Sequence, residues 1–202
     1  MDLVSRRSLR AAVVGMVLGD AHIRPKRCTL AIRHSARQKA YLHYKAEILE
    51  QLQKAPIRVF PFNNSGYPGV RVETQRRPLY RRLRRLFYEE PTGRKHVTRK
   101  VLDYLDPRGI AIWYMDDGSV SAKRRNGKVH AYELTLNTYI PRDENELIIR
   151  YFAETWDLRF GLNLSKGNWR LRMGTRQARR LAQLVAPYIV PTMRYKVDPL
   201  LV

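Results

Sequence analysis

The architecture of this chain rests on two stretches, VVGMVLGDA at residues 13–21 and IAIWYMDDG at residues 110–118. Each is a short apolar run typical of a buried helix, and each ends in a carboxylate, Asp20 in the first and Asp117 in the second. A carboxylate there opposes the negative end of the helix dipole, at a cost of about 0.3–1 kcal/mol. If the two helices pack side by side, both charges arrive at one place, and divalent cations would stabilise them.

The first of these helices carries a row of small residues, Ala11, Gly15 and Gly19, along one face. Small residues in such a row let another helix backbone approach closely. The second stretch has no such row at the same offset, so the close contacts are expected either largely from the first helix or from Gly109 and Ala111 on a slightly rotated face.

The elements around the two stretches recur in one order. We expect a short arm over Met1–Arg10 that leads into the first helix. The first half is then predicted to contain a helix at Ala11–Gly19, strands at Thr29–Arg33, Arg58–Phe62 and Val70–Thr74, and helices at Gln38–Gln53 and Leu79–Tyr88. The second is predicted to contain a helix from Asp106 to Asp116, strands at Val120–Arg125, Lys128–Thr138, Leu162–Ser165 and Trp169–Met173, and helices at Glu144–Trp156 and Thr175–Ala186.

Each half therefore runs helix, two strands, helix, two strands, helix. The tetrapeptides PTGR at 91–94 and PTMR at 191–194 repeat 100 residues apart, which supports an internal duplication. The sequence predicts an α+β protein of two pseudo-symmetric halves, residues 1–105 and 106–202.

The charge of the chain points to a polyanionic partner. Its 202 residues include 39 basic and 18 acidic side chains, a formal net charge of +21. The longest apolar stretch, Ala11–Gly19, is far shorter than the roughly 20 residues of a membrane span. Nucleic acid is favoured over a membrane surface, because the basic segment with Leu79, Leu83 and Leu86 suits a helix packed on a core and not one with an exposed apolar face. The single cysteine, Cys28, excludes an internal disulfide framework, and the five histidines show no metal-ligand spacing. A soluble, intracellular type of protein is expected.

Both stretches resemble LAGLIDADG motifs, and the second, with its WYMDDG core, resembles the form found in single-chain, intron-encoded homing endonucleases. The closing PYIVP at 187–191, followed by Tyr195 and Lys196, is similar to the same branch. The resemblance covers essentially the whole chain. It implies two αββαββα halves, each offering a curved, four-stranded antiparallel sheet to the DNA major groove, packed through the two motif helices.

The resemblance also implies the roles of several residues. Asp20 and Asp117 would be the metal-binding catalytic acids, with two or more Mg²⁺ ions at a shared site. Lys95 and Lys196 would lie near the active centre, one from each half. Asp116 is not expected to be a ligand, because its counterpart in the first half is Gly19; we expect it to cap its turn.

The strands are expected to place alternate side chains on DNA. Arginine suits the guanine edge, so the candidates for base contacts are Arg33, Arg71, Arg170 and Arg172. Which face of each strand meets DNA is left open. The turn at Asn126-Gly127 marks a basic hairpin expected to contact phosphates through Lys123, Arg124, Arg125 and Lys128.

Together these features predict a monomeric, site-specific endonuclease that cuts both strands of DNA at a long, asymmetric target, an intron insertion site. Two alternatives stay open on the same fold. One is a maturase that binds intron RNA and assists splicing; the other is a DNA-binding protein without catalytic activity. The sequence determines neither the target nor the compartment, which would be that of the host intron, a bacterial or archaeal cytoplasm or an organelle.

Overall fold

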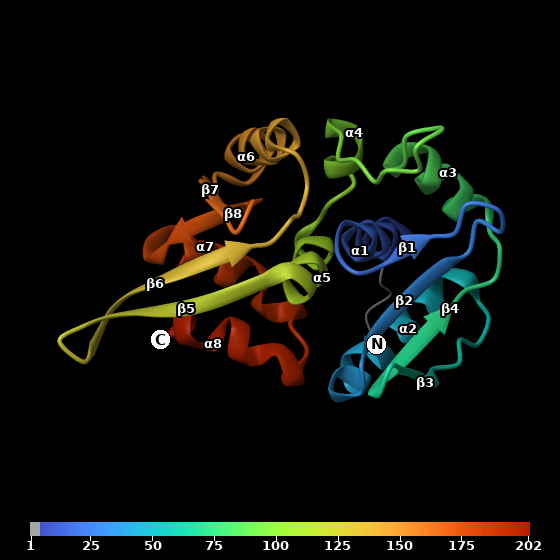
Figure 1. Cartoon of the computed structure of the whole chain (residues 1–202), viewed down its shortest axis with the longest axis horizontal. Coiled ribbons are helices and arrows are strands. Elements are labelled where there is room, and N and C mark those ends of the chain that lie inside the picture. Colours follow the sequence, from blue (N-terminus) through green and yellow to red (C-terminus); the bar gives the residue numbers. More distant parts are fainter. Residues whose placement is uncertain (1–4) are drawn as a thin grey trace.

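A computed structural model describes residues 5–202, and Figure 1 shows its two halves on either side of a central pair of helices. The first half contains α1 (Arg6–Leu18), β1 (His22–Ile23), β2 (Leu30–Ser35), α2 (Lys39–Gln53), β3 (Phe60–Asn64), β4 (Tyr67–Glu73), α3 (Pro78–Phe87) and α4 (Arg99–Leu102). The second contains α5 (Pro107–Asp117), β5 (Gly118–Arg125), β6 (Lys128–Leu136), α6 (Arg142–Trp156), β7 (Gly161–Ser165), β8 (Asn168–Gly174), α7 (Thr175–Val185) and α8 (Asp198–Leu201).

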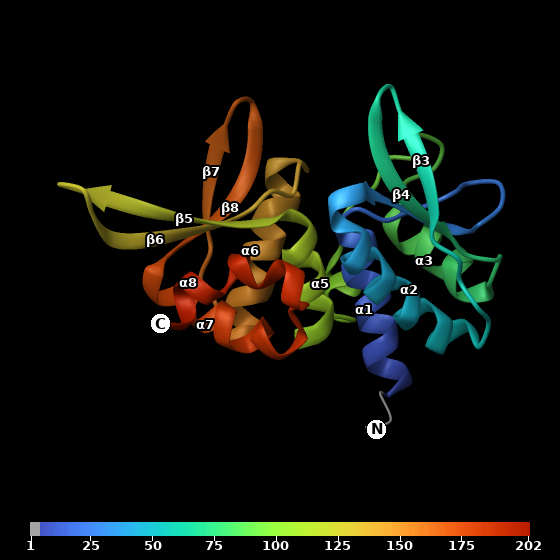
Figure 2. The same ribbon diagram turned by 90° about the horizontal axis from the view of Figure 1, so that it is seen from below.

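The two sheets have the same topology. Their strand orders are β1-β2-β4-β3 and β5-β6-β8-β7, and all pairs are antiparallel. The α+β class and the αββαββα order predicted from the sequence are thereby confirmed. The β3–β4 and β7–β8 hairpins rise to the same side of the molecule, and α1 begins at the opposite side (Figure 2).

Several boundaries differ from those predicted. The expected arm is wrong from Arg6 onward: α1 begins there, because the hydroxyl of Ser5 accepts a hydrogen bond from the backbone N–H of Ser8 and caps the helix. Residues 1–4 lie outside the described residues. The two-residue strand β1 was not predicted, since so short a strand has no periodicity to detect. Strand β6 ends at Leu136, two residues earlier than expected.

The two motif helices, α1 and α5, pack against each other at the centre of the molecule (Figures 1 and 2). A Cβ atom added at Gly15 would lie 2.1 Å from the carbonyl oxygen of Gly109, and one added at Gly109 would lie 2.5 Å from that of Ala11. The backbones therefore touch where the sequence placed small residues, and Gly109 is the partner from the rotated face. This contact brings the C-terminal ends of both helices together.

A methyl group at the contact should force the helices apart. We expect Gly15→Ala to destabilise the protein by about 1–3 kcal/mol, the usual cost of overpacking, measured by urea denaturation. Gly174→Ala is the matched control, because an added Cβ there has no atom within 4 Å. In the absence of the contact, alanine would stabilise a helix interior by about 1 kcal/mol relative to glycine, so a more stable Gly15→Ala variant would contradict the packing.

Candidate active site

Asp20 and Asp117 lie at the C-terminal ends of the paired helices. Asp117 is the last residue of α5, and Asp20 follows Gly19, the C-cap residue of α1. The indole N–H of Trp113 donates to Oδ2 of Asp117 at 3.1 Å. Burial raises the pKa of Asp117 to about 7, and the charges of Asp116 and Asp20 add to this. Burial, then the charge of Asp116, also raises the pKa of Asp20, whose side chain is 41% exposed.

Two lysines hold the same helix ends. The ammonium of Lys95 donates to the carbonyl oxygens of Val17 and Gly19, at 2.7 and 3.0 Å. Lys196 donates to the carbonyl oxygen of Met115 at 2.5 Å. Burial lowers the pKa of both lysines, and the nearby aspartates oppose that shift. The structure thus brings together the four residues that the sequence analysis named for this site, and each lysine offsets the negative end of a helix dipole.

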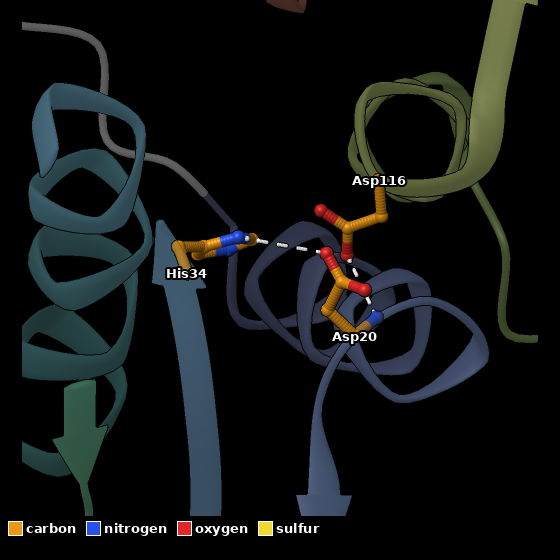
Figure 3. A group of neighbouring side chains, drawn as sticks. All are labelled: Asp20, His34 and Asp116. Carbon is orange, nitrogen blue, oxygen red and sulfur yellow. Dashed lines mark hydrogen bonds and ion pairs between the residues drawn. The ribbon is translucent and has the colours of Figure 1, made fainter. Parts of the chain in front are cut away.

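Asp116 does not cap its own turn, which corrects the expectation. Its carboxylate reaches across to the first half, where Oδ2 accepts the backbone N–H of Asp20 at 3.1 Å. Its two oxygens also lie 2.6 and 2.8 Å from the ammonium of Lys45, and neither side chain is exposed to solvent. Figure 3 shows Asp116 projecting from α5 toward Asp20.

Asp20, His34 and Asp116 form a group that resembles a metal site, with one potential ligand atom from each within 4.8 Å of the others (Figure 3). Two contacts argue against that use. The Lys45 ammonium already neutralises Asp116, and it also lies 3.1 Å from Nε2 of His34. Burial, followed by the charge of Lys45, lowers the pKa of His34 to about 4, so the imidazole is neutral at pH 7. Because its Nε2 accepts from Lys45, the nitrogen that faces Asp20, Nδ1, carries the proton and cannot ligate a metal. Asp20 and Asp117, which Lys45 does not contact, suit a metal better.

Sequence reasoning missed Lys45, His34 and Tyr41. The hydroxyl of Tyr41 donates to Oδ1 of Asp116 at 2.8 Å. One signal for Lys45 was present: it falls on the apolar face of α2, three residues before Ile48 and four after Tyr41, where a charge must be paired. Its partner lies 71 residues away in the chain, so the sequence could not identify it.

The arginines named for base contacts share the exposed faces of the sheets. Arg33 and Arg71 are directly opposite each other on β2 and β4, and both are exposed between buried neighbours. On β8, Arg170 and Arg172 lie on one face, and the buried Leu171 takes the other. The guanidinium of Arg172 is 3.6 Å from the carboxylate of Glu133, which also pairs with Lys123 at 3.0 Å.

The basic hairpin extends farther from the centre of the molecule than the other β-hairpins (Figures 1 and 2). Arg125 and Lys128 are opposite each other at its tip, next to the turn. The guanidinium of Arg124 donates to the carbonyl oxygen of Gly127 at 3.0 Å. All four basic residues of the hairpin, Lys123 included, are exposed, so they can contact an extended polyanion.

Among the described residues, no helix has the length and apolar character needed to cross a membrane. The profile of the LAGLIDADG DNA endonuclease family matches residues 10–181. A relative in Mycosarcoma maydis, named probable intron-encoded DNA endonuclease 3, is 34% identical over 122 residues, which is 55% of this chain and 79% of that protein.

Two further similarities extend over nearly the whole chain. A protein named RecA in Mycolicibacterium flavescens is 29% identical over 200 residues, 93% of this chain, but the chain spans only 45% of that protein's length. A solved structure described as the homing endonuclease I-WcaI bound to its DNA recognition sequence has a TM-score of 0.79 and 22% identity. That similarity covers 98% of this chain and 88% of that one.

Proposed function

Because the chain belongs to the LAGLIDADG DNA endonuclease family, we propose that it is a homing endonuclease that cuts both strands of DNA with divalent metal ions. The observation that carries this proposal is the meeting of Asp20 and Asp117 at the ends of two helices in backbone contact. The family match and the net charge of +21 indicate DNA as the substrate. The target would be long and asymmetric, since two non-identical halves read it, and would be the insertion site of an intron.

The donor set fits a hard divalent cation. Asp20 and Asp117 offer carboxylate oxygens, which Mg²⁺ prefers, and their mutual repulsion is relieved when a cation lies between them. Two or more bound ions would polarise the phosphodiester and lower the pKa of an attacking water. Lys95 and Lys196 hold the helix ends that carry the two aspartates, and their ammonium groups attract the DNA phosphates.

The proposed enzyme works as a monomer, because one chain carries both motifs. We take residues 1–105 and 106–202 as its two halves, each contacting one side of the target. One relative is named RecA, but this sequence has no glycine-rich phosphate-binding loop of the GxxxxGK[ST] type. We therefore do not propose nucleotide hydrolysis for this chain.

The direct test is cleavage of a plasmid that carries the intronless insertion site of the encoding gene. We expect magnesium to support linearisation of that plasmid, and calcium to support binding without cutting, because calcium accepts looser geometry. A plasmid with the intron in place serves as the control, since the insertion divides the target. Failure to cut the intronless site in magnesium, by protein shown to bind it, would refute the proposed activity and favour the DNA-binding alternative.

Metal binding should depend on pH through Asp117, whose pKa is raised to about 7. Below pH 7 this carboxyl holds a proton that a bound cation must displace, so metal affinity should rise between pH 6 and pH 8. Calorimetric titration of calcium into the complex with DNA, repeated in buffers of different ionisation enthalpy, measures the protons released. An affinity and proton release that do not change over this range would contradict the burial of Asp117.

If the exposed sheet faces read DNA, alanine substitutions of their arginines should lower DNA affinity or base preference. The four positions are Arg33, Arg71, Arg170 and Arg172. An arginine that forks onto guanine is worth about 1–3 kcal/mol of discrimination, whereas a phosphate contact affects all sequences equally. Competition binding against single-base target variants separates the two. The Arg172 effect should be the smaller of the β8 pair, because Glu133 already partly neutralises that guanidinium. Unchanged affinity and base preference in all four variants would mean that these sheet faces do not contact DNA.

A further inference from the structure

A buried ion pair joins the two halves beside Asp20. Lys45 lies on α2 and Asp116 on α5; both side chains are fully buried, and the ammonium is 2.6 and 2.8 Å from the two carboxylate oxygens. Desolvating two charges costs several kcal/mol each, and well-packed apolar residues of similar size often stabilise a protein equally well. Stability alone therefore does not account for this pair.

The remaining bonds of Asp116 fix its carboxylate against the backbone of Asp20. Oδ2 accepts the Asp20 N–H at 3.1 Å, and Oδ1 accepts the hydroxyl of Tyr41 at 2.8 Å. Together with the two contacts to Lys45, these bonds fill the roughly four acceptor positions of a carboxylate. Asp116 is therefore a rigid link between the two helix ends.

Within residues 5–202, the pair is present on one side of the pseudo-symmetric interface only. The counterpart of Asp116 is Gly19, where an added Cβ would lie 2.4 Å from Oδ2 of Asp116, so the absent side chain makes room for the carboxylate. Helices α2 and α6 each have 15 residues, and Lys45 is the seventh of the first. The seventh of α6 is the buried, apolar Ile148.

Lys45 also orients the second group that flanks Asp20. Its ammonium lies 3.1 Å from Nε2 of His34, which completes three acceptors for its three protons. Since Nε2 accepts, Nδ1 carries the imidazole proton; Nδ1 lies 3.1 Å from the amide oxygen of Gln38 and 3.5 Å from the Asp20 carboxylate. One cation thus orders both the backbone and the side-chain surroundings of Asp20.

We propose that Lys45 is a positioning residue for Asp20: it holds Asp116 against the Asp20 backbone and His34 beside its carboxylate. The inference rests on the proposed function only for its effect on cleavage. Because Asp117 lacks an equivalent pair, loss of Lys45 should displace one of the two candidate metal ligands and leave the other in place. The two DNA strands should then be cut at unequal rates.

The test uses the double variant Lys45→Met with Asp116→Asn, which leaves no unpaired buried charge and so retains the fold if the single Lys45→Met variant unfolds. The matched control is Glu144→Gln. Glu144 is largely buried and also joins the halves, through Arg94 at 2.6 Å and the backbone N–H of Val97, and it has no contact with Asp20.

The first measurement is amide hydrogen exchange by NMR on the protein without DNA, which requires no activity. In the double variant the Asp20 amide should exchange about tenfold faster, the loss expected for a hydrogen bond to a charged group. The Gly118 amide, bonded to the carbonyl of Tyr114 at the end of α5, should not change. In Glu144→Gln, the ratio of the exchange rates of the Asp20 and Gly118 amides should stay as it is in the wild type.

The second measurement is single-turnover cleavage of supercoiled plasmid in magnesium with saturating protein. The double variant should accumulate the nicked form, with the ratio of the two strand rates shifted about tenfold from that of the wild type, whereas Glu144→Gln should leave the ratio unchanged. A loss of folded protein slows both strands equally and cannot produce this shift. Wild-type strand ratios, or an unchanged Asp20 amide, would overturn the role of Lys45. A wild-type protein that does not cut would refute the proposed function, and the exchange result would still decide the positioning role.

Discussion

Asp20→Asn and Asp117→Asn should each abolish double-strand cleavage and leave DNA binding largely intact. Even the loss of a residue that supports a metal ligand typically costs 10–100-fold, so the loss of a ligand carboxylate should slow cutting by more than about 100-fold. The amide keeps the size of the side chain and removes its charge, and DNA affinity should not fall, because a repulsive negative charge has been lost. Plasmid cleavage in magnesium and gel-shift binding in calcium measure the two properties separately.

Asp116→Asn is the informative comparison for these two variants. It changes a carboxylate of the same helix end that the Lys45 ammonium already neutralises. It should reduce cleavage by less than either ligand variant and should change stability more, since it breaks a buried pair. If Asp20→Asn or Asp117→Asn cut both strands at the wild-type rate, the assignment of that residue as a metal ligand would be wrong.

DNA affinity should fall steeply with salt. Each phosphate that the protein neutralises releases counterions and adds about −0.9 to the slope of log K against log salt concentration. About eight contacts by a protein of net charge +21 would give a slope near −7, and a loss on the order of 10⁴ in affinity between 50 and 200 mM salt. Fluorescence anisotropy with a labelled duplex in calcium measures this slope. A shallow slope would count against duplex DNA as the partner.

The basic hairpin should carry part of that slope. Replacing Lys123, Arg124, Arg125 and Lys128 by serine should flatten it by about one to three units, with little change in the preferred target. The comparison variant, which removes two positive charges instead of four, has serine at the exposed, basic residues Arg176 and Arg179 of α7, a helix on the side away from the β7–β8 hairpin (Figure 2). An unchanged slope in the hairpin variant would mean that the hairpin points away from DNA.

The sequence predicted the parts of the fold that depend on local pattern. The αββαββα order follows from periodicity and turn residues, and the helix contact follows from Gly15 with Gly109, because only small residues let two backbones touch. The start of α1 was missed because its basic residues look like a solvated arm, and a single Ser5 cap extends the helix to Arg6. The division of the halves at residues 105 and 106 stays a prediction.

The candidate site was predictable where each half repeats the other and unpredictable where the halves differ. Asp20 and Asp117 end the two similar motif stretches, and the resemblance to the LAGLIDADG family added Lys196 and, one position off the 100-residue repeat, Lys95. The Lys45–Asp116 pair has no counterpart, since Gly19 stands in the symmetric place, and a pair formed between distant helices leaves no local signal. Which face of each strand is exposed could also be decided only from the structure. On β2, Ile32 and His34 are buried, and Arg33 between them is therefore exposed on the opposite face.

The central claim is that Asp20 and Asp117 together hold the metal that cuts DNA, and anomalous diffraction from a Mn²⁺-soaked crystal of the protein with its duplex tests it most directly. We expect anomalous density within bonding distance of both carboxylates and of the scissile phosphates, and none on Asp116, whose oxygens the Lys45 ammonium occupies. Density on Asp116 and His34, with none on Asp117, would contradict the account.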